Sequence, residues 1–247
     1  MHSSAPSPPR GTTGYSRVLV IVPALNEADS LPGTLDALRA AAPSADVLVV
    51  DDGSRDATGA VARSRGVAVV RHAFNLGVGA ALQTGFRYAV ERDYAVAVQF
   101  DADGQHDPND LAAVVAPVAE GRCDVSIGSR YVTATGYRAP VARRAGMLLF
   151  AGLVRLAVRQ RITDTTSGYR AYGRAVMEVC QHDFPRDFPD APLLIMLARR
   201  GFRLLEVPAR MHERHAGKSF YTLGKKLYYP YKNLLASLMA WLQRREP

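Results

Sequence analysis

The sequence lacks the features that define several protein classes. It has no uncharged apolar run of the roughly 18 to 20 residues that cross a bilayer, and its longest apolar stretch, Met147–Val158, is much shorter. Residues 1–16 contain Ser, Pro and Gly but no apolar signal-peptide core, so we expect a disordered tail. The two cysteines, Cys123 and Cys180, are too few for a disulfide framework and have no CxxC spacing, so both are expected in the core. These absences exclude a helical membrane-spanning protein and predict a cytoplasmic one.

The composition is that of a globular protein with an uneven charge. The chain has 247 residues, 48% hydrophobic and 22% charged, which is enough for one large domain or two small ones. Its net charge of +8 arises in residues 199–247, which contain eleven Lys or Arg and three Asp or Glu, whereas residues 1–198 contain twenty of each. A basic end of this kind is typical of proteins that bind phosphates, an anionic membrane surface or nucleic acid.

Strand-like and helix-like segments alternate along the first hundred residues. Runs of apolar and β-branched residues predict strands buried on both faces at 17–23, 46–50, 66–70 and 94–100. Segments of helical length lie at 28–41, 56–65 and 78–92. The alternation predicts an α/β fold with a Rossmann-like, doubly wound and mostly parallel sheet that has helices on both faces. Ligands bind such sheets at the carboxyl ends of the strands.

Polar residues gather where these strands end. In chain order they are Pro23, Asn26 and Glu27; Asp51, Asp52, Gly53 and Ser54; Asn75 and Gly77; and Asp101, Asp103 and Gln105. The glycine turn at 75–79 has two interpretations, a site where backbone N–H groups approach an anionic ligand or a tight strand-to-helix connection. The pair Asp51–Asp52 is better explained by hydrogen bonds to a ligand, whereas Asp56 is a candidate helix N-cap.

The acidic segment 101–107 has the chemistry of a cation site. Asp101 and Asp103 are two residues apart at a strand end, so both carboxylates can face one site, and their mutual repulsion calls for a cation. Hard oxygen ligands suit Mg²⁺ or Mn²⁺, and a divalent ion bridged to a diphosphate fits the pattern. Asp107 precedes Pro108 and is expected to cap a helix. His106 is either a metal ligand or a residue that faces solvent or hydrogen-bonds a neighbour.

Taken together, several motifs resemble one known family. The segments PALNEADSL, VVDDGSRDAT, NLGVGAA, QFDADGQHDP and GSRY occur in the order and spacing of inverting family 2 glycosyltransferases of the GT-A fold. The resemblance spans roughly residues 17 to 219. Within that family, DADGQH followed by DTTSGYRAY and RHAGKS is most similar to polyprenol-phosphate sugar synthases of the dolichyl-phosphate mannose synthase type.

The resemblance implies a role for each matching residue. Residues of the first three motifs would bind the nucleotide sugar: Pro23, Asn26, Glu27, Asp51, Asp52, Asn75 and Gly77. Asp101 would contact the sugar and ribose side of the donor, and Asp103 and Gln105 would hold the Mg²⁺ or Mn²⁺. Arg214 and Lys218 match a basic segment that closes on the diphosphate, and Arg130 matches a residue near the acceptor phosphate. The implied donor is GDP-mannose or a UDP-sugar, and the implied acceptor is a polyprenyl phosphate.

The need for a general base distinguishes the acceptor classes. A phosphate monoester is already an anion at neutral pH, so a base is dispensable, whereas a sugar hydroxyl needs one. Asp164 and Asp190 are the candidate bases. Each has a structural alternative, because Asp164 could organise a turn and Asp190 could cap the helix predicted at 191–200. A soluble hydroxyl acceptor is therefore a second hypothesis beside the polyprenyl phosphate.

Two basic, amphipathic segments bear on membrane contact. Residues 141–160 and 220–245 combine Lys and Arg with apolar or aromatic residues at helical spacing, as interfacial helices do. They predict peripheral association with the anionic inner face of the cell membrane; packing on the domain, or on a second copy in a homo-oligomer, is the alternative. Nucleic-acid binding is a distant hypothesis, because no motif of that kind accompanies the basic charge.

The predicted domain organisation follows these segments. We expect a tail at 1–16, a catalytic domain at 17–219 with a nucleotide-sugar half (17–125) and an acceptor half (126–219), and a basic aromatic segment of amphipathic helices at 220–247.

Overall fold

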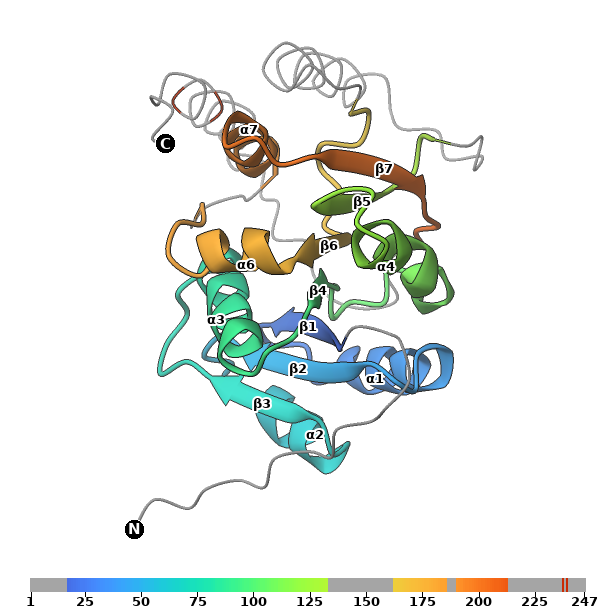
Figure 1. The fold of residues 1–247 in the computed structure, drawn as a ribbon. Coiled ribbons are helices and arrows are strands. Elements are labelled where there is room, and N and C mark those ends of the chain that lie inside the picture. The colour runs from blue at the N-terminus through green and yellow to red at the C-terminus, as the bar shows by residue number, and fades with distance from the viewer. Residues whose placement is uncertain (1–16, 133–161, 186–189, 213–236, 238, 240–247) are drawn as a thin grey trace, which may run out of the picture.

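The computed structural model describes residues 17–132, 162–185 and 190–212, together with Ser237 and Met239 (Figure 1). Several expectations lie outside these residues. They are the tail at 1–16, the amphipathic segment at 141–160, the basic loop with Arg214 and Lys218, and the C-terminal helices expected in 220–247.

A seven-stranded sheet organises the fold, in the order β3-β2-β1-β4-β6-β5-β7. Strand β6 is antiparallel to both of its neighbours, and all other pairs are parallel. The strands are β1 (Val18–Ala24), β2 (Asp46–Asp51), β3 (Ala68–Arg71), β4 (Val96–Gln99), β5 (Val125–Ser129), β6 (Arg170–Gly173) and β7 (Leu204–Pro208). The predicted mostly parallel α/β sheet is therefore confirmed.

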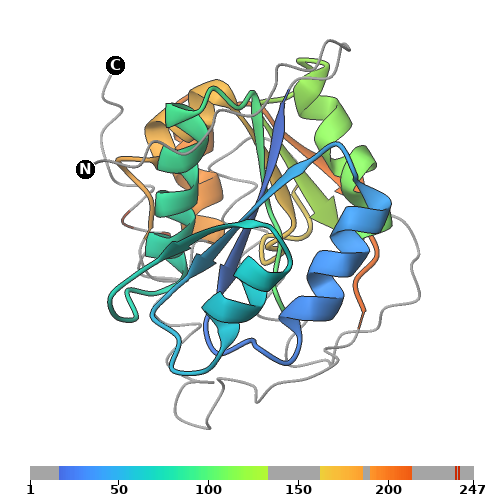
Figure 2. The same ribbon diagram turned by 90° about the horizontal axis from the view of Figure 1, so that it is seen from below.

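Helices cover both faces of the sheet (Figures 1 and 2). Helices α3, α6 and α7 pack on one face, and α1, α2 and α4 pack on the other. Each face of the sheet has its own hydrophobic cluster. Their bounds are α1 (Leu31–Ala41), α2 (Thr58–Ser64), α3 (Val78–Glu91), α4 (Leu111–Ala119), α6 (Arg174–Cys180) and α7 (Ala191–Arg199), with a 3₁₀ turn η1 (Pro108–Asp110) before α4. Within the described ranges, none of the helices is long and apolar enough to cross a bilayer.

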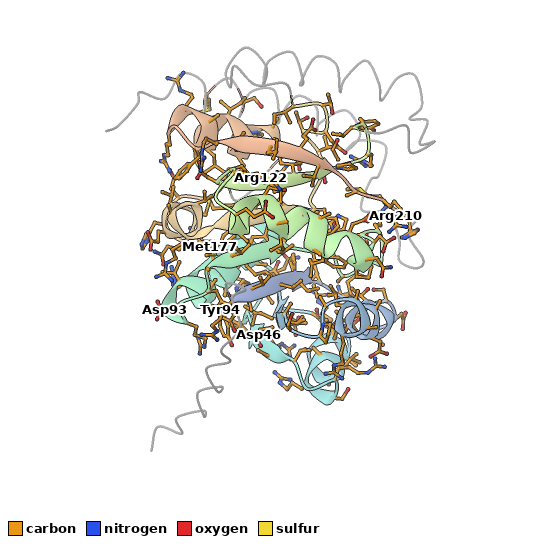
Figure 3. The ribbon with its side chains drawn as sticks, turned by 45° about the vertical axis from the view of Figure 1, so that its right-hand side comes forward. Asp46, Asp93, Tyr94, Arg122, Met177 and Arg210 are labelled. Carbon is orange, nitrogen blue, oxygen red and sulfur yellow. The ribbon has the colours of Figure 1, made fainter. Side chains whose placement is uncertain are left out.

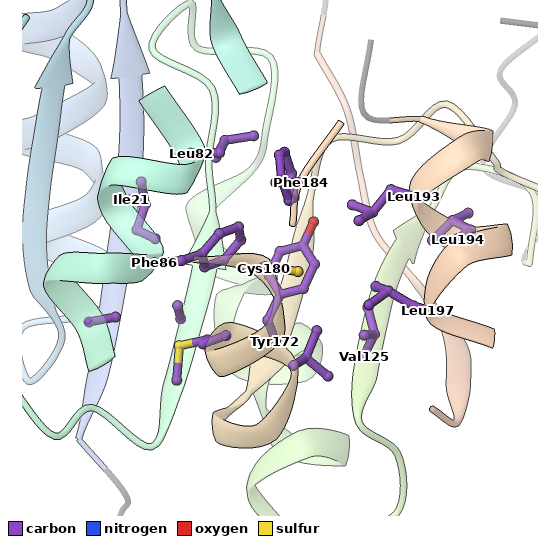
Figure 4. Close-up of a cluster of buried hydrophobic side chains, with 14 of the residues drawn as sticks. Ile21, Leu82, Phe86, Val125, Tyr172, Cys180, Phe184, Leu193, Leu194 and Leu197 are labelled. Carbon is purple, nitrogen blue, oxygen red and sulfur yellow. The ribbon is translucent and has the colours of Figure 1, made fainter. Parts of the chain in front are cut away.

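The central strand β1 shows why its sequence is apolar throughout. Leu19 and Ile21 belong to the cluster under α3, α6 and α7, whereas Val20 and Val22 belong to the cluster on the opposite face. Side chains alternate across a strand, so a strand covered on both faces needs apolar residues at every position. Figure 4 shows the first cluster, in which Phe86 lies between Ile21 and Tyr172, and the leucines of α7 lie on the other side of Tyr172.

Several predicted boundaries differ from the structure by one to three residues. The helix expected from residue 28 begins at Leu31, because Glu27 to Ser30 form a turn in which Leu31 N–H donates to the Glu27 carbonyl at 2.9 Å. The helix expected from Asp56 begins at Thr58. The strand expected from Gly66 begins at Ala68, because Gly66 takes a φ of +67° and ends the α2 segment. Only glycine adopts that φ readily, and it is incompatible with an extended strand.

The sheet runs through both halves of the predicted catalytic domain. Strand β5 begins at Val125, where the boundary between the halves was placed. The division into a nucleotide-sugar half and an acceptor half remains a prediction.

Candidate active site

The carboxyl ends of β1 and β2 are tied together by side-chain hydrogen bonds. Asn26 has a φ of +54°, its N–H donates to the Ser54 hydroxyl at 2.9 Å, and its side-chain oxygen accepts from Arg55 N–H at 2.8 Å. Glu27 N–H donates to the Thr58 hydroxyl at 2.9 Å. Pro23 lies on β1 opposite Val50 of β2. The structure therefore brings Pro23, Asn26 and Glu27 to the edge where the predicted nucleotide-binding residues of β2 also lie.

Asp51 and Asp52 are both buried, and both bind groups of the protein itself. Asp51 accepts from Ser54 N–H at 2.9 Å, and its other oxygen lies 3.3 Å from Arg71 Nε. Asp52 accepts from the N–H groups of Leu76 (2.9 Å) and Gly77 (2.8 Å). The anion held by the N–H groups of this glycine turn is thus the Asp52 carboxylate. Contact between either aspartate and a base or ribose remains a prediction.

The acidic segment after β4 folds into a tight loop. Asp103 is 4% exposed and its Oδ1 accepts from Gln105 N–H at 3.0 Å, while Gly104 takes a φ of +76°. Asp101 is more accessible, with 37% of its side chain exposed. Asp107 caps η1 as predicted, accepting from Asn109 N–H at 2.9 Å. Asp101, Asp103 and Gln105 therefore lie together on one loop at the carboxyl end of β4.

His106 supports this loop from inside. Its ring stacks on Tyr169 with centroids 4.7 Å apart and meets the edge of Phe100. Burial lowers the pKa of His106 to about 4, so the ring is neutral at physiological pH. Nδ1 accepts from Asp101 N–H at 3.1 Å, which places the ring proton on Nε2, 3.4 Å from the Asp101 carboxylate. Of the two interpretations of His106, the structure supports the hydrogen-bonding neighbour.

The segment at residues 210–212, just after β7, hydrogen-bonds to the acidic loop. His212 N–H donates to the Gln105 carbonyl at 2.8 Å, and Asp107 N–H donates to the Arg210 carbonyl at 3.4 Å. The Arg210 side chain binds the Asp110 carboxylate at 3.1 Å and lies 3.3 Å from Asp107. Figure 3 shows Arg210 at this edge, with Asp46, Asp93 and Tyr94 at the opposite one.

Arg130 and Asp164 form an ion pair at the end of β5. Arg130 Nε and Nη2 donate to the two Asp164 oxygens at 2.8 and 2.7 Å, and Arg130 N–H donates to the same carboxylate at 3.1 Å. Asp164 is fully buried, and 14% of the Arg130 side chain is exposed. This ion pair ties the loop that carries Asp164 to the end of β5, and it engages both carboxylate oxygens with a cation.

Glu206 on β7 holds the segment that carries Asp164. Its carboxylate accepts from Asp164 N–H at 2.6 Å and from both the N–H and the hydroxyl of Thr163 at 2.9 Å. Sequence reasoning missed Glu206, because it lies 42 residues from Asp164 inside an ordinary strand pattern.

The loop that carries Asp164 also approaches the end of β4 and the acidic segment at Gly168. A Cβ built at Gly168 would lie 3.0 Å from Gln99 Nε2 and 3.4 Å from Asp101 Oδ2. A side chain at this position would be in tight contact with the ends of Gln99 and Asp101. Asp101 and the Asp164 loop therefore border one site.

Asp190 immediately precedes α7, as predicted, but within the described part of the chain its side chain makes no capping hydrogen bond to that helix. Residues 186–189 beside it, and Arg214 and Lys218, lie outside the described residues.

Comparison with known proteins identifies a family and relatives that match most of the chain. Residues 19–180 match the model of the family described as Glycosyl transferase family 2. The chain is 38% identical over 214 residues to an undecaprenyl-phosphate mannosyltransferase of Micrococcus luteus, covering 82% of this chain and 86% of the relative. It is 37% identical over 213 residues to a polyprenol monophosphomannose synthase of Mycolicibacterium smegmatis, covering 82% and 80%.

A solved structure shares the fold. Glucosyl-3-phosphoglycerate synthase of Mycobacterium tuberculosis, crystallised with Mn²⁺, UDP-glucose and phosphoglyceric acid, superposes with a TM-score of 0.68 at 19% identity, covering 92% of this chain and 80% of that one.

Proposed function

Because this chain belongs to glycosyltransferase family 2, we propose that it transfers a mannose-type hexose from a nucleotide sugar to a polyprenyl phosphate. The names of the two relatives, a mannosyltransferase and a monophosphomannose synthase that act on polyprenyl carriers, support this substrate class. GDP-mannose is the first candidate donor, and a UDP-sugar is the alternative.

The observation that carries the choice of acceptor is the ion pair between Arg130 and Asp164. A carboxylate whose two oxygens both accept hydrogen bonds from a guanidinium is a poor general base. A guanidinium fixed at the end of β5 suits an anionic acceptor. A phosphate monoester needs no base, so the geometry favours a phosphate acceptor over a hydroxyl.

The donor would lie along the carboxyl ends of β1 to β4. Asn26 and Asn75, which are both exposed there, would contact the nucleotide. Pro23, Glu27, Asp51, Asp52 and Gly77 would shape the base and ribose site, the two aspartates by fixing the surrounding loops. Arg214 and Lys218 would add positive charge near the diphosphate.

The acidic loop fits a divalent cation that is shared with substrate. Among the described residues, no group of three or more His, Cys, Asp and Glu could hold a metal alone. The oxygens of Asp103 and Gln105, beside Asp101, are hard ligands, and Mg²⁺ or Mn²⁺ commonly completes its shell with phosphate oxygens and water. When bound, such an ion stabilises negative charge on the diphosphate as a Lewis acid.

The proposed reaction is an inverting displacement. An oxygen of the acceptor phosphate forms a bond to the anomeric carbon while the bond from that carbon to the diphosphate oxygen breaks. The electron pair leaves with the nucleoside diphosphate, and no proton has to be removed from the acceptor. Asp101 would orient the sugar, and Arg130, held by Asp164, would orient the acceptor phosphate.

A hydroxyl acceptor remains the second candidate function. It would require Asp190 as the base, because Asp164 is engaged by Arg130. Association with the anionic inner leaflet, proposed from residues 141–160 and 220–245, would give access to a lipid acceptor but is not required by a soluble one.

The test is nucleoside diphosphate release by the full chain with Mn²⁺, a nucleotide sugar (GDP-mannose or UDP-glucose) and a short polyprenyl phosphate. We expect release to need all three, and Asp103→Asn to reduce it by roughly 100-fold or more. Asp93→Asn is the matched control, because Asp93 is 89% exposed at the opposite edge of the sheet and should leave the rate unchanged (Figure 3). Equal turnover with a sugar alcohol and no lipid phosphate would contradict the proposal.

A further inference from the structure

The loop after β3 is fixed by a buried histidine that sequence analysis did not single out. Building on the proposed function, we propose that His72 is a positioning residue of the nucleotide site, which acts through Asp52 on the turn at residues 74–77.

The first step is the contact between His72 and Asp52. His72 Nδ1 lies 2.7 Å from Asp52 Oδ1, and the two side chains are only 10% and 5% exposed. The same Oδ1 accepts from Leu76 N–H at 2.9 Å, and Oδ2 accepts from Gly77 N–H at 2.8 Å. Three donors thus fix the rotation of one carboxylate, and that carboxylate in turn fixes two successive peptide groups of the turn.

The second step is the anchor on α3. A carboxylate only accepts, so Nδ1 of His72 carries a proton, and Nε2 lies within hydrogen-bond distance of the Thr84 hydroxyl at 2.9 Å. The imidazole therefore spans from Asp52, just after β2, to the body of a helix. This bridge ties the turn to the rigid core, because α3 packs on β1 beneath it.

The third step is that backbone contacts restrict the conformation of the turn at residues 74–77. A Cβ built at Gly53 would lie 2.5 Å from the Phe74 carbonyl carbon, so the two loops pack backbone against backbone. His72 N–H also donates to the Asp51 carbonyl at 2.9 Å. Gly77 takes a φ of +95°, which presents its N–H to Asp52.

These contacts predict a specific consequence for nucleotide binding. Without the imidazole, Asp52 loses one of its three donors and can rotate away from Leu76 and Gly77. The exposed Asn75 between Asp52 and α3 then loses its fixed position. Donor affinity should fall, while the acidic loop and the Arg130–Asp164 pair, which share none of these contacts, keep their geometry.

The test measures GDP and UDP binding to the full chain with Mn²⁺ by calorimetry, together with donor KM and kcat. We expect His72→Ala to weaken binding of the preferred nucleotide and raise the donor KM by roughly 5- to 20-fold, with kcat at saturating donor within about twofold of wild type. His72→Asn, which keeps an N–H donor near the Nδ1 position, should recover most of the affinity. Thr84→Val, which removes only the far anchor, should have an intermediate effect.

The control is His182→Ala, at an exposed position after α6, which should change nothing. Unchanged nucleotide affinity in both His72→Ala and Thr84→Val would overturn the inference, even if their melting temperatures fell. If His72→Ala does not fold, unchanged nucleotide affinity in Thr84→Val by itself overturns it. Failure of the wild-type chain to bind either nucleotide would instead contradict the proposed function.

Discussion

Arg130 and Asp164 are 34 residues apart in the chain and form a two-pronged ion pair at the end of β5, where both carboxylate oxygens accept hydrogen bonds from the guanidinium. Asp164 is fully buried, so its charge is compensated by Arg130 and by the surrounding N–H groups. The pair bears on the two acceptor hypotheses, because in the proposed function it would make Asp164 a positioning residue and not a general base.

Asp164→Asn tests this role. The amide cannot accept from both guanidinium nitrogens, and Arg130 loses its counter-charge. Breaking a buried pair costs at most roughly 3–5 kcal/mol of folding stability, and less here because Arg130 is partly exposed. We expect the KM for polyprenyl phosphate to rise while nucleotide affinity is kept, measured by steady-state kinetics and calorimetry. A variant that loses turnover with an unchanged acceptor KM, and that no longer shows the acidic limb of the pH–rate profile, would instead indicate a general base.

Glu206→Gln should act on the same loop from β7. The Glu206 carboxylate now accepts three hydrogen bonds, two from Thr163 and one from Asp164. In the variant, the amide NH₂ would face at least one of these donors. We expect the free energy of unfolding to fall by roughly 1–3 kcal/mol and the acceptor KM to rise, with donor binding unchanged. Glu178→Gln, on the exposed side of α6, is the matched control. An acceptor KM equal to that of wild type would show that Glu206 does not act through Asp164.

Two glycine-to-alanine variants should change stability in opposite directions. A Cβ at Gly85 would lie 2.4 Å from Ile21 Cγ2, so Gly85→Ala forces α3 away from β1 and should cost roughly 1–3 kcal/mol. Gly33 in α1 has open space around the built Cβ, so Gly33→Ala should gain about 0.5–1 kcal/mol from helix propensity. Urea unfolding curves compare both with wild type. Equal stability of the two variants would contradict the close packing of α3 on β1.

Tyr172 predicts a loss of stability in alkali. Burial raises its pKa to about 12, above its ordinary value of 10, and its hydroxyl donates to Gln99 at 3.2 Å. Between these values the unfolded chain releases the proton while the folded chain keeps it, so stability falls as the pH rises. The contribution is fully present below pH 10, and about 1 kcal/mol of it should be gone near pH 11.

The measurement is the urea midpoint of wild type and Tyr172→Phe between about pH 8 and pH 11. The Phe variant should lose less stability over this range, whatever constant cost the missing hydrogen bond adds. Tyr88→Phe, at a half-buried position on α3, serves as the comparison. Parallel pH dependence in wild type and Tyr172→Phe would contradict the assignment.

Much of the fold could be predicted because its signals are local. The apolar runs of β1, β2 and β4 identify strands covered on both faces, and the polar residues after them mark the edge where the site lies. Errors fell at element ends such as Leu31 and Ala68, where a turn hydrogen bond or a positive φ at Gly66 decides the boundary. Strand β6, antiparallel between β4 and β5, was not predicted, because strand order depends on contacts between distant segments.

The amino-acid sequence by itself determined the family, the α/β class, and which residues gather at the carboxyl ends of the strands. The tertiary structure alone decided what those residues bind: Asp52 pairs with His72 and the peptides after it, Asp164 with Arg130 and Glu206, and His106 is neutral because two aromatic rings enclose it. The physical reason is that composition and periodicity are properties of neighbouring residues. The partner of a buried charge is chosen by three-dimensional proximity, which the order of strands in the sheet sets.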